Sequence, residues 1–251
     1  MSNEAASWRI PPHELSFPSN RIDIWRVCLE SSNLSESDLA GILSPDEDDR
    51  ASRFHFDEDR KRFARCRVAL RIILGHYLDM HPAEIRFRYE KDGKPEIANA
   101  QDSRGLRFNI ANSCGLALIA VSSGRALGVD VEKVRPKLDC VEIALRVFSD
   151  REVRAFLSLP ENKRQRAFFA CWTRKEALLK ATGKGLAYSL ADFSVSVDPD
   201  GPAEVCELKE NLGGAGRWFL TDLHPGEGYI GALALEGPSC SIETWCWDEL
   251  Y

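Results

Sequence analysis

The strongest constraint on the fold is the order in which helical and strand-like patterns follow one another along the chain. Each half contains one long helical segment, near residues 58–78 and 161–182, with short runs of strand type after it. This order is typical of α+β proteins, in which helices and sheets bury their apolar faces against each other. We therefore expect two similarly sized α+β lobes, residues 1–125 and 126–251, with a seam near residues 124–128.

The local patterns place the individual elements. Strands are predicted at residues 21–29, 84–89, 106–111, 115–122, 127–134, 193–197, 218–222 and 229–235, and helices near Asp46 and at 58–78, 148–157 and 161–182. Ser149 and Glu152 predict a capping box at the start of the third helix. Gly183 is a natural left-handed end for the fourth helix, and Lys91-Asp92-Gly93 predicts a turn.

The composition excludes several classes of protein. Hydrophobic residues make up 44% and charged residues 29% of the 251 positions, which supplies a globular core and excludes whole-chain disorder, collagen and coiled coil. No apolar run approaches the roughly 20 residues that span a bilayer, and the N-terminus lacks the pattern of a secretory signal. We expect a cytoplasmic protein with no membrane partner. The net charge of −6 argues against nucleic acid as a partner.

The eight cysteines are scattered, with no Cys-x-x-Cys pair and no clustered histidine. Structural zinc sites need closely spaced soft ligands, and disulfides are rare in reducing compartments. We expect free thiols.

Residues 50–71 carry a net positive charge, although the chain as a whole is negative. Residues 50–71 contain eight basic and three acidic side chains, an excess of five positive charges. Two interpretations remain open, a solvated helix face or a site for an anion such as a phosphate or an acidic partner protein. The basic residues are Arg50, Arg53, Arg60, Lys61, Arg62, Arg65, Arg67 and Arg71.

Three acids and a lysine form the candidate chemical site. Asp130 and Glu132 share one face of a strand, about 7 Å apart along it, and such a pair suits Mg²⁺ or is simply an exposed strand face. Trp172, Glu176 and Lys180 lie at i, i+4 and i+8 and share one helix face. The helical pair can be a surface ion pair, or it can join the strand acids to bind a metal and a pyrophosphate.

Two segments taken together resemble a known family. Residues 128–133, Gly-Val-Asp-Val-Glu-Lys, and residues 169–186, Phe-Ala-Cys-Trp-Thr-Arg-Lys-Glu-Ala-Leu-Leu-Lys-Ala-Thr-Gly-Lys-Gly-Leu, are similar to the double signature of the 4′-phosphopantetheinyl transferases. The length and the order of elements resemble the double-length, monomeric Sfp-type branch. The resemblance runs from about residue 44 to residue 235 and includes Arg53-Phe54, Asp59–Arg62, Gly93-Lys94-Pro95, Phe108-Asn109-Ile110, Phe193-Ser-Val and Gly228-Tyr229.

The resemblance implies a fold of two similar, pseudo-symmetric α/β lobes with the active site at their interface. It also implies an Mg²⁺-dependent monomer that moves 4′-phosphopantetheine from coenzyme A to a serine of an apo acyl- or peptidyl-carrier protein, releasing adenosine 3′,5′-bisphosphate. Such carriers serve fatty-acid, polyketide or nonribosomal-peptide synthesis.

The same resemblance implies roles for individual residues. Asp130, Glu132 and Glu176 match the Mg²⁺ ligands, and Glu176 also matches the proposed base for the carrier serine. Lys180 matches a catalytic lysine on the pyrophosphate, and Arg50 matches a basic position at the 3′-phosphate. The positions implied to contact coenzyme A are Arg50, Arg62, Lys94, Asn112, Ser113, Asp130 and Lys180.

The chain also departs from the family pattern. The usual Ser-His-Ser-Gly stretch is Ala111-Asn112-Ser113-Cys114, so a neutral amide replaces the histidine, and we expect weaker nucleotide binding. Glu47 stands at a second basic position near the 3′-phosphate. Glu152 matches a recurrent family acid, which its capping box already explains.

Two other functions are considered. The first is a non-catalytic relative that binds coenzyme A or a carrier protein, as the departures at residues 111 and 112 suggest. The second is another Mg²⁺-dependent phosphoryl transferase, which the lack of a Gly-rich phosphate loop disfavours.

Overall fold

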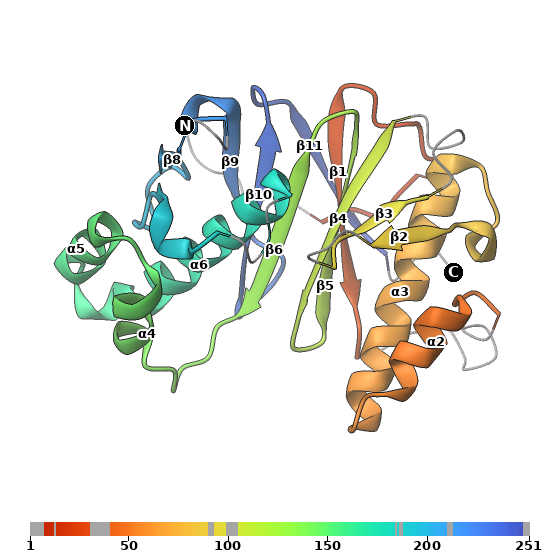
Figure 1. Cartoon of the computed structure of the whole chain (residues 1–251), viewed down its shortest axis with the longest axis horizontal. Helices are drawn as coiled ribbons and strands as arrows, with labels where there is room; N and C mark the ends of the chain where they lie inside the picture. Colours follow the sequence, from red (N-terminus) through yellow and green to blue (C-terminus); the bar gives the residue numbers. More distant parts are fainter. Residues whose placement is uncertain are drawn as a thin grey trace.

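The computed structural model describes residues 8–12, 14–30, 41–89, 93–98, 105–183, 185, 188–209 and 213–247 (Figure 1). The elements of the first half are β1 (Arg21–Cys28), α2 (Pro45–Ser52), α3 (Asp57–Leu78), η1 (Pro82–Glu84), β2 (Phe87–Tyr89), β3 (Pro95–Ile97), β4 (Leu106–Ser113) and β5 (Leu116–Ser123). Those of the second half are β6 (Leu127–Lys133), α4 (Cys140–Val147), α5 (Asp150–Ser158), α6 (Glu161–Thr182), η3 (Leu190–Asp192), β7 (Ser194–Val195), β8 (Val205–Glu207), η5 (Ala215–Arg217), β9 (Trp218–Leu223), β10 (Tyr229–Glu236) and β11 (Ser241–Cys246).

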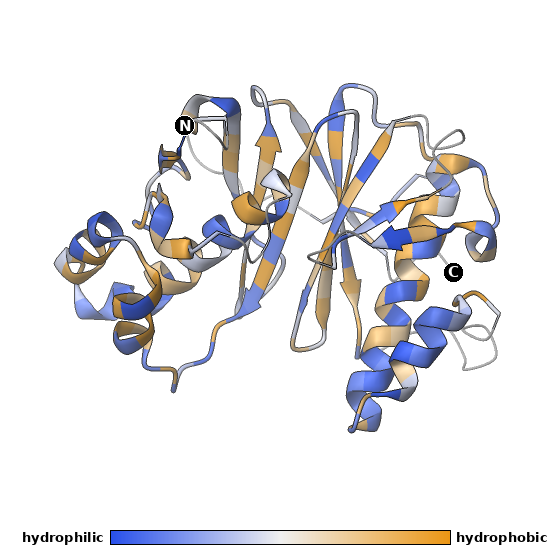
Figure 2. Ribbon diagram, in the orientation of Figure 1, coloured by the Kyte–Doolittle hydropathy of each residue, from blue (hydrophilic) through white to orange (hydrophobic). Residues whose placement is uncertain are grey.

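The two larger sheets of the described chain are each covered by one long helix, and two small two-stranded sheets, β2-β3 and β7-β8, accompany them. The first of the larger sheets has the strand order β11-β1-β5-β4, and the second has the order β6-β10-β9. Helix α3 packs on the first sheet, where Leu70 and Ile73 share a core with Trp25. Helix α6 packs on the second sheet, where Phe168 shares a core with Ala232. Figure 2 shows hydrophobic stretches along the strands of both sheets, whereas α2 is mostly hydrophilic.

The two sheets pack on each other through the faces that α3 and α6 leave uncovered. A third core joins Ile24 and Leu118 of the first sheet to Val129 and Leu233 of the second. At one edge β4 lies beside β6 (Figure 1), and the Asn109 side-chain oxygen accepts a hydrogen bond from the Val129 N–H at 2.8 Å. This side-chain bridge fixes the two sheets to each other where their strands come closest.

A buried ion pair joins each long helix to a short helix that precedes it. In the first half, Arg71 Nε donates to Glu47 of α2 at 2.6 Å. In the second, Lys175 Nζ donates to Glu152 of α5 at 2.6 Å. Both glutamates occupy the third helical position after a serine N-cap, and both cations are the fifteenth residue of a 22-residue helix. Because all four side chains are buried, these pairs belong to the architecture of the two halves.

Most of the predicted elements are confirmed. Helices α2, α3, α5 and α6 and strands β1, β4, β5, β6, β9 and β10 lie at or within a few residues of their predicted bounds, and α6 ends at Gly183 with φ +64°. The predicted capping box of Ser149 and Glu152 is present. The predicted turn is described only at Gly93, which has φ +82°, since residues 91 and 92 lie outside the described residues.

Some predictions of extent were wrong. The strand predicted at 84–89 starts only at Phe87, because Pro82 begins a short 3₁₀ turn that includes Glu84. The strand predicted at 193–197 is reduced to Ser194–Val195. Helix α4 and strands β3, β8 and β11 were not predicted.

Strand β11 lies at the end of the sequence but belongs to the first sheet. It pairs in parallel with β1, with Arg21 opposite Ser241 and Arg26 opposite Cys246. The last strand of the predicted second lobe therefore belongs to the sheet of the first. A boundary drawn in sequence at residue 125 does not capture this crossing, because the pairing joins residues more than two hundred positions apart.

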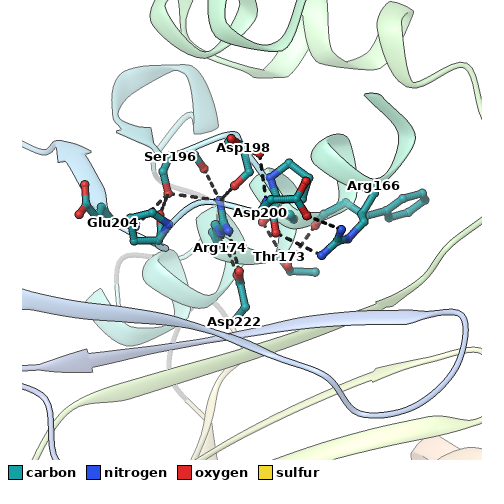
Figure 3. A network of polar contacts seen from close by, with 12 residues as sticks. Arg166, Thr173, Arg174, Ser196, Asp198, Asp200, Glu204 and Asp222 are labelled. Carbon is teal, nitrogen blue, oxygen red and sulfur yellow. Dashed lines mark hydrogen bonds and ion pairs between the residues drawn. The ribbon is translucent and has the colours of Figure 1, made fainter. Parts of the chain in front are cut away.

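Arg174 is the centre of a polar network in the second half (Figure 3). Its guanidinium is fully buried and binds both carboxylate oxygens of Asp222 on β9, at 2.8 and 2.6 Å. It also donates to the backbone carbonyls of Ser196 and Asp198, at 2.8 and 3.1 Å. One side chain of α6 therefore holds both the second sheet and the loop that follows β7.

We expect Arg174→Met to lower the free energy of unfolding by about 3–5 kcal/mol, because it leaves the Asp222 charge without its buried partner. Urea denaturation measures this loss. The matched control is Arg166→Gln, which removes an exposed partner of Asp200 in the same network and should leave the midpoint nearly unchanged. Equal losses in the two variants would contradict the assigned role of Arg174.

Candidate active site

A cavity of about 870 Å³ lies between the helices of the first half and α6 of the second. Six of the residues assigned by resemblance line it, namely Arg50, Arg62, Lys94, Asn112, Glu176 and Lys180. They come from α2, α3, the segment before β3, strand β4 and helix α6, so the fold brings distant parts of the sequence to one place. A smaller cavity of about 340 Å³ adjoins Lys94, which is the only one of the assigned residues that lines it among those the structure describes.

The helix face predicted from residue spacing is confirmed. Trp172, Glu176 and Lys180 all line the larger cavity. Their helix approaches β6 very closely at Gly128, where a Cβ atom would lie 2.0 Å from the Ala177 carbonyl oxygen. Only glycine allows this approach, and it places α6 directly against the strand that carries Asp130 and Glu132.

Asp130 and Lys180 form an ion pair at this contact. Lys180 Nζ lies 2.7 Å from Asp130 Oδ1 and donates a second hydrogen bond to the Val129 carbonyl at 3.2 Å. The Asp130 side chain is buried, and its Oδ2 atom has no hydrogen-bond partner among the described residues. A buried carboxylate oxygen without a partner is costly, and a cation would satisfy it.

Burial raises the pKa of Asp130 to about 6. The Lys180 charge opposes this rise, whereas Glu176 and Glu132 add to it by repulsion. Burial likewise raises the pKa of Glu176, against the lowering effect of Lys180. Glu132 is therefore close enough to both Asp130 and Glu176 to disfavour their ionised forms.

Glu132 is held by the end of β4. Its Oε2 atom accepts a hydrogen bond from Ser113 Oγ at 2.7 Å, and Ser113 Oγ in turn accepts one from the Lys133 N–H at 3.2 Å. The structure thus assigns the Ser113 hydroxyl to Glu132, and Ser113 is not among the residues that line the cavity.

The three acids are neighbours that do not converge on one point. Within the described part of the chain, no group of three or more His, Cys, Asp or Glu side chains is arranged to hold a metal ion. Their chemistry nevertheless fits a hard divalent cation, because carboxylate oxygens are the ligands that Mg²⁺ prefers. The unpartnered Asp130 Oδ2 supports this fit. Two cations pair with the acids, Lys180 with Asp130 and, at 3.8 Å, Arg135 with Glu132.

The other basic residues at the cavity have defined contacts. Lys94 Nζ donates to the carbonyl of Lys180 at 2.6 Å and so ties the segment before β3 to α6. Arg62 Nη2 donates to Glu30 at 2.7 Å. The Arg50 guanidinium lies over the Phe63 ring, 5.3 Å from its centre.

The basic side chains of residues 50–71 divide between the cavity and contacts elsewhere. Arg50, Arg62 and Arg67 line the cavity. The remaining five bases are held elsewhere, in ion pairs with acidic side chains or, for one of them, on backbone carbonyls; they are Arg53, Arg60, Lys61, Arg65 and Arg71.

Glu47 does not line the cavity. It is 1% exposed, and its two oxygens accept hydrogen bonds from Arg67 and Arg71 and from the N–H and hydroxyl of Ser44. Glu152 is likewise buried and accepts hydrogen bonds from Lys175, Ser149 and Val195. Both glutamates therefore have structural partners that account for them.

Asn109 belongs to the site but was not predicted as a site residue. Asn109 lines the cavity while its side chain bridges β4 and β6. An amide within a strand of buried apolar residues is an available signal, since buried polar groups need partners. Asn112 is exposed at the cavity, and the neighbouring Cys114 adopts φ +42° at a position that favours glycine.

All eight cysteines are free thiols, as predicted. Among the described residues no helix combines the length and apolarity needed to cross a membrane.

Comparison with known proteins finds consistent similarities. A family model described as 4′-phosphopantetheinyl transferase superfamily matches residues 126–234, and one described as 4′-phosphopantetheinyl transferase, N-terminal, matches residues 32–124. The chain is 38% identical to the 4′-phosphopantetheinyl transferase HetI of Nostoc sp. over 95% of its own length and 98% of that protein. It is 31% identical to the 4′-phosphopantetheinyl transferase Sfp of Bacillus subtilis over 65% of its own length and 70% of that protein.

Among solved structures, that of Thermotoga maritima holo-[acyl-carrier-protein] synthase matches with 25% identity and a TM-score of 0.36. The match covers 45% of this chain and 64% of that chain.

We expect Gly128→Ala to lower the free energy of unfolding by about 1–3 kcal/mol, because the added methyl group overlaps the backbone of α6. Gly216→Ala is the control, since no atom lies within 4 Å of its Cβ position. Urea denaturation of both variants tests the contact. A Gly128→Ala variant as stable as the unmodified chain would show that β6 and α6 are not in this close contact.

Proposed function

The chain belongs to the 4′-phosphopantetheinyl transferase superfamily, and from this membership we propose that it transfers 4′-phosphopantetheine from coenzyme A to a serine of apo acyl- or peptidyl-carrier proteins. The second product is adenosine 3′,5′-bisphosphate. The observation that carries the proposal is the meeting of Asp130, Lys180 and Glu176 beside a cavity lined by arginines. This cavity offers positive charge for the nucleotide phosphates next to acids that fit a cation.

We propose that Asp130, Glu132 and Glu176 hold Mg²⁺. The fit rests on the donor set, on the unpartnered Asp130 Oδ2 and on the hydrogen bond from Ser113 that orients Glu132. When bound, the ion neutralises charge on the pyrophosphate of coenzyme A.

Two side chains of α6 are the proposed catalytic residues. Lys180 lines the cavity and stabilises the negative charge that develops on the pyrophosphate during transfer. Glu176 accepts the proton of the carrier serine, directly or through water. Burial raises the pKa of the Glu176 carboxyl, which makes it a better proton acceptor than an exposed glutamate.

The nucleotide contacts are proposed for the remaining cavity residues. Arg50 faces the 3′-phosphate, whereas Arg62 and Lys94 lie near the adenosine phosphates. Asn112 donates a neutral hydrogen bond in place of the charged one that the family histidine gives. Ser113 acts through Glu132, which its hydroxyl holds.

We further propose that the protein works as a cytoplasmic monomer on carriers of fatty-acid, polyketide or nonribosomal-peptide synthesis, with neither nucleic acid nor a membrane as partner. The lobes are residues 1–125 and 126–251, with β11 crossing to the first sheet. The junction between the two family matches, at residues 124 and 126, supports this division.

The function is tested by intact mass spectrometry of apo-carrier proteins incubated with the chain, coenzyme A and Mg²⁺. We expect each accepted carrier to gain the mass of one phosphopantetheine group, and chelation of Mg²⁺ to stop the gain. Asp130→Asn should slow transfer roughly 100-fold or more, the size of effect typical for loss of a charge-stabilising group. Asp200→Asn is the control, because Asp200 is exposed and lies outside the cavity.

Calorimetry, together with the mass measurement, distinguishes a transferase from a non-catalytic binding protein. Calorimetric binding of coenzyme A that is indifferent to Mg²⁺, together with no mass gain on any carrier of a panel, would contradict the transferase. A near-normal rate for Asp130→Asn would remove Asp130 from the metal site.

A further inference from the structure

The turn that joins β4 to β5 belongs to the first sheet but contacts two strands of the second, β6 and β10. Ser113 pairs with Leu116, so Cys114 and Gly115 alone form the turn. Their φ angles are +42° and +90°, the pattern of a two-residue type I′ turn. Glycine adopts positive φ freely, whereas a residue with a side chain, such as Cys114, does so at a cost. The contacts around the turn therefore decide whether it keeps this form and this place.

Tyr229, the first residue of β10, reaches the turn from the second sheet. Its hydroxyl donates a hydrogen bond to the Cys114 carbonyl at 2.6 Å. Its ring packs against the core that joins the two larger sheets, as does Leu116 at the end of the turn. Lys133 is opposite Tyr229 in the pairing of β6 with β10, and its ammonium lies over the ring, 5.3 Å from the centre. The ring is thus fixed by packing, and its hydroxyl has a defined place at the turn.

The Tyr229 hydroxyl is a donor over the whole neutral range of pH. Burial raises the pKa of Tyr229 above its ordinary value near 10. The proton that the hydroxyl gives to the Cys114 carbonyl is therefore always present under conditions in which the protein works.

The turn connects this hydroxyl to Glu132. Ser113 directly precedes Cys114, and its Oγ donates to Glu132 Oε2 at 2.7 Å. The same Oγ accepts a hydrogen bond from the Lys133 N–H at 3.2 Å. Two successive residues of one hairpin thus bind two neighbouring strands, Ser113 to β6 and Cys114 to β10. A shift of the turn away from Tyr229 would carry the Ser113 hydroxyl away from Glu132.

Gly115, on the other side of the turn, is held by the first sheet. Its carbonyl accepts a hydrogen bond from the Leu29 N–H at 2.7 Å. The Glu30 side chain covers it so closely that a Cβ atom on Gly115 would lie 2.3 Å from Glu30 Oε1. These contacts fix Gly115 relative to β1, whereas the bond from Tyr229 ties the backbone of the turn to the second sheet. The distance from Ser113 to Glu132 lies across this junction.

We propose that Tyr229 is a positioning residue for Glu132, because its hydroxyl holds the Cys114–Gly115 turn in the place from which Ser113 orients the Glu132 carboxylate. The inference rests on the proposed function in one respect, namely that Glu132 is an Mg²⁺ ligand. Groups that orient a ligand by hydrogen bonds contribute to metal affinity without touching the ion. Neither Tyr229 nor Ser113 lines the cavity, so an effect of either hydroxyl on the ion passes through Glu132.

Calorimetric titration of the full chain with Mg²⁺, with and without coenzyme A, tests the connection. We expect Ser113→Ala to weaken Mg²⁺ binding about tenfold and Tyr229→Phe to weaken it about threefold. The double variant should lose about tenfold and not the product of about thirtyfold, because the Tyr229 hydroxyl acts through that of Ser113. Unchanged Mg²⁺ affinity in Tyr229→Phe would overturn the proposal. A thirtyfold loss in the double variant would also overturn it.

Tyr77→Phe is the matched control. It too removes one tyrosine hydroxyl, which donates to Asp23 at 2.7 Å, and Tyr77 is buried away from the cavity. This variant should lower the melting temperature and leave Mg²⁺ affinity unchanged. A loss of Mg²⁺ affinity in Tyr77→Phe equal to that in Tyr229→Phe would assign both effects to stability and contradict the positioning role.

A second measurement needs neither Mg²⁺ nor transfer. The Lys133 N–H is bonded to Ser113 Oγ, so its hydrogen exchange, followed by NMR, reports whether Ser113 stays in place. We expect exchange about threefold faster in Tyr229→Phe and unchanged in Tyr77→Phe. An unchanged rate in Tyr229→Phe would overturn the proposal whatever the chain transfers. Faster exchange in a chain that transfers nothing would contradict the transferase and support the link from Tyr229 to Glu132.

Discussion

The close contact between β6 and α6 at Gly128 is the constraint on which the rest of the site depends. Any side chain at this position would overlap the helix backbone, with the first added carbon 2.0 Å from the Ala177 carbonyl oxygen. Because side chains alternate along a strand, the residue two positions on, Asp130, faces the same helix. Lys180, on the next turn of α6, then reaches both Asp130 and the Val129 carbonyl. The absence of a side chain at Gly128 therefore brings α6 close enough for Lys180 to pair with Asp130.

The cavity that opens beside this contact is polarised. At one end Arg50 and Arg67 give an excess of positive charge, because Glu47 neutralises only one of the two buried arginines it contacts. Beside Lys180, at the other end, the carboxylates of Asp130, Glu132 and Glu176 outnumber the cations paired with them, Lys180 and Arg135. A ligand that carries phosphates fits the excess of positive charge at the arginines. A cation bound between that ligand and the carboxylates fits the excess of negative charge near Lys180. This matching is the physical basis for the proposal that coenzyme A lies in the cavity with its pyrophosphate and a divalent ion together beside Lys180.

The sequence predicted what depends on local pattern and motif. Helix α6 follows from its spacing and from Gly183, and the acids of β6 follow from a strand period of two. It could not predict that β11 pairs with β1, because that pairing joins opposite ends of the chain. Nor could it predict that Glu47 turns inward, since the orientation depends on arginines twenty and twenty-four positions away. Short strands such as β8 leave too few residues for a periodic signal.

The central claim is that the nucleotide lies in the cavity between the two halves, with its pyrophosphate at Lys180. A crystal structure of the chain with coenzyme A and Mg²⁺ tests this most directly. The account predicts an ion on Asp130, Glu132 and Glu176, and a Lys180 ammonium that has left Asp130 for a pyrophosphate oxygen. Coenzyme A bound outside this cavity, or Lys180 still paired with Asp130 with no ion at the acids, would contradict it.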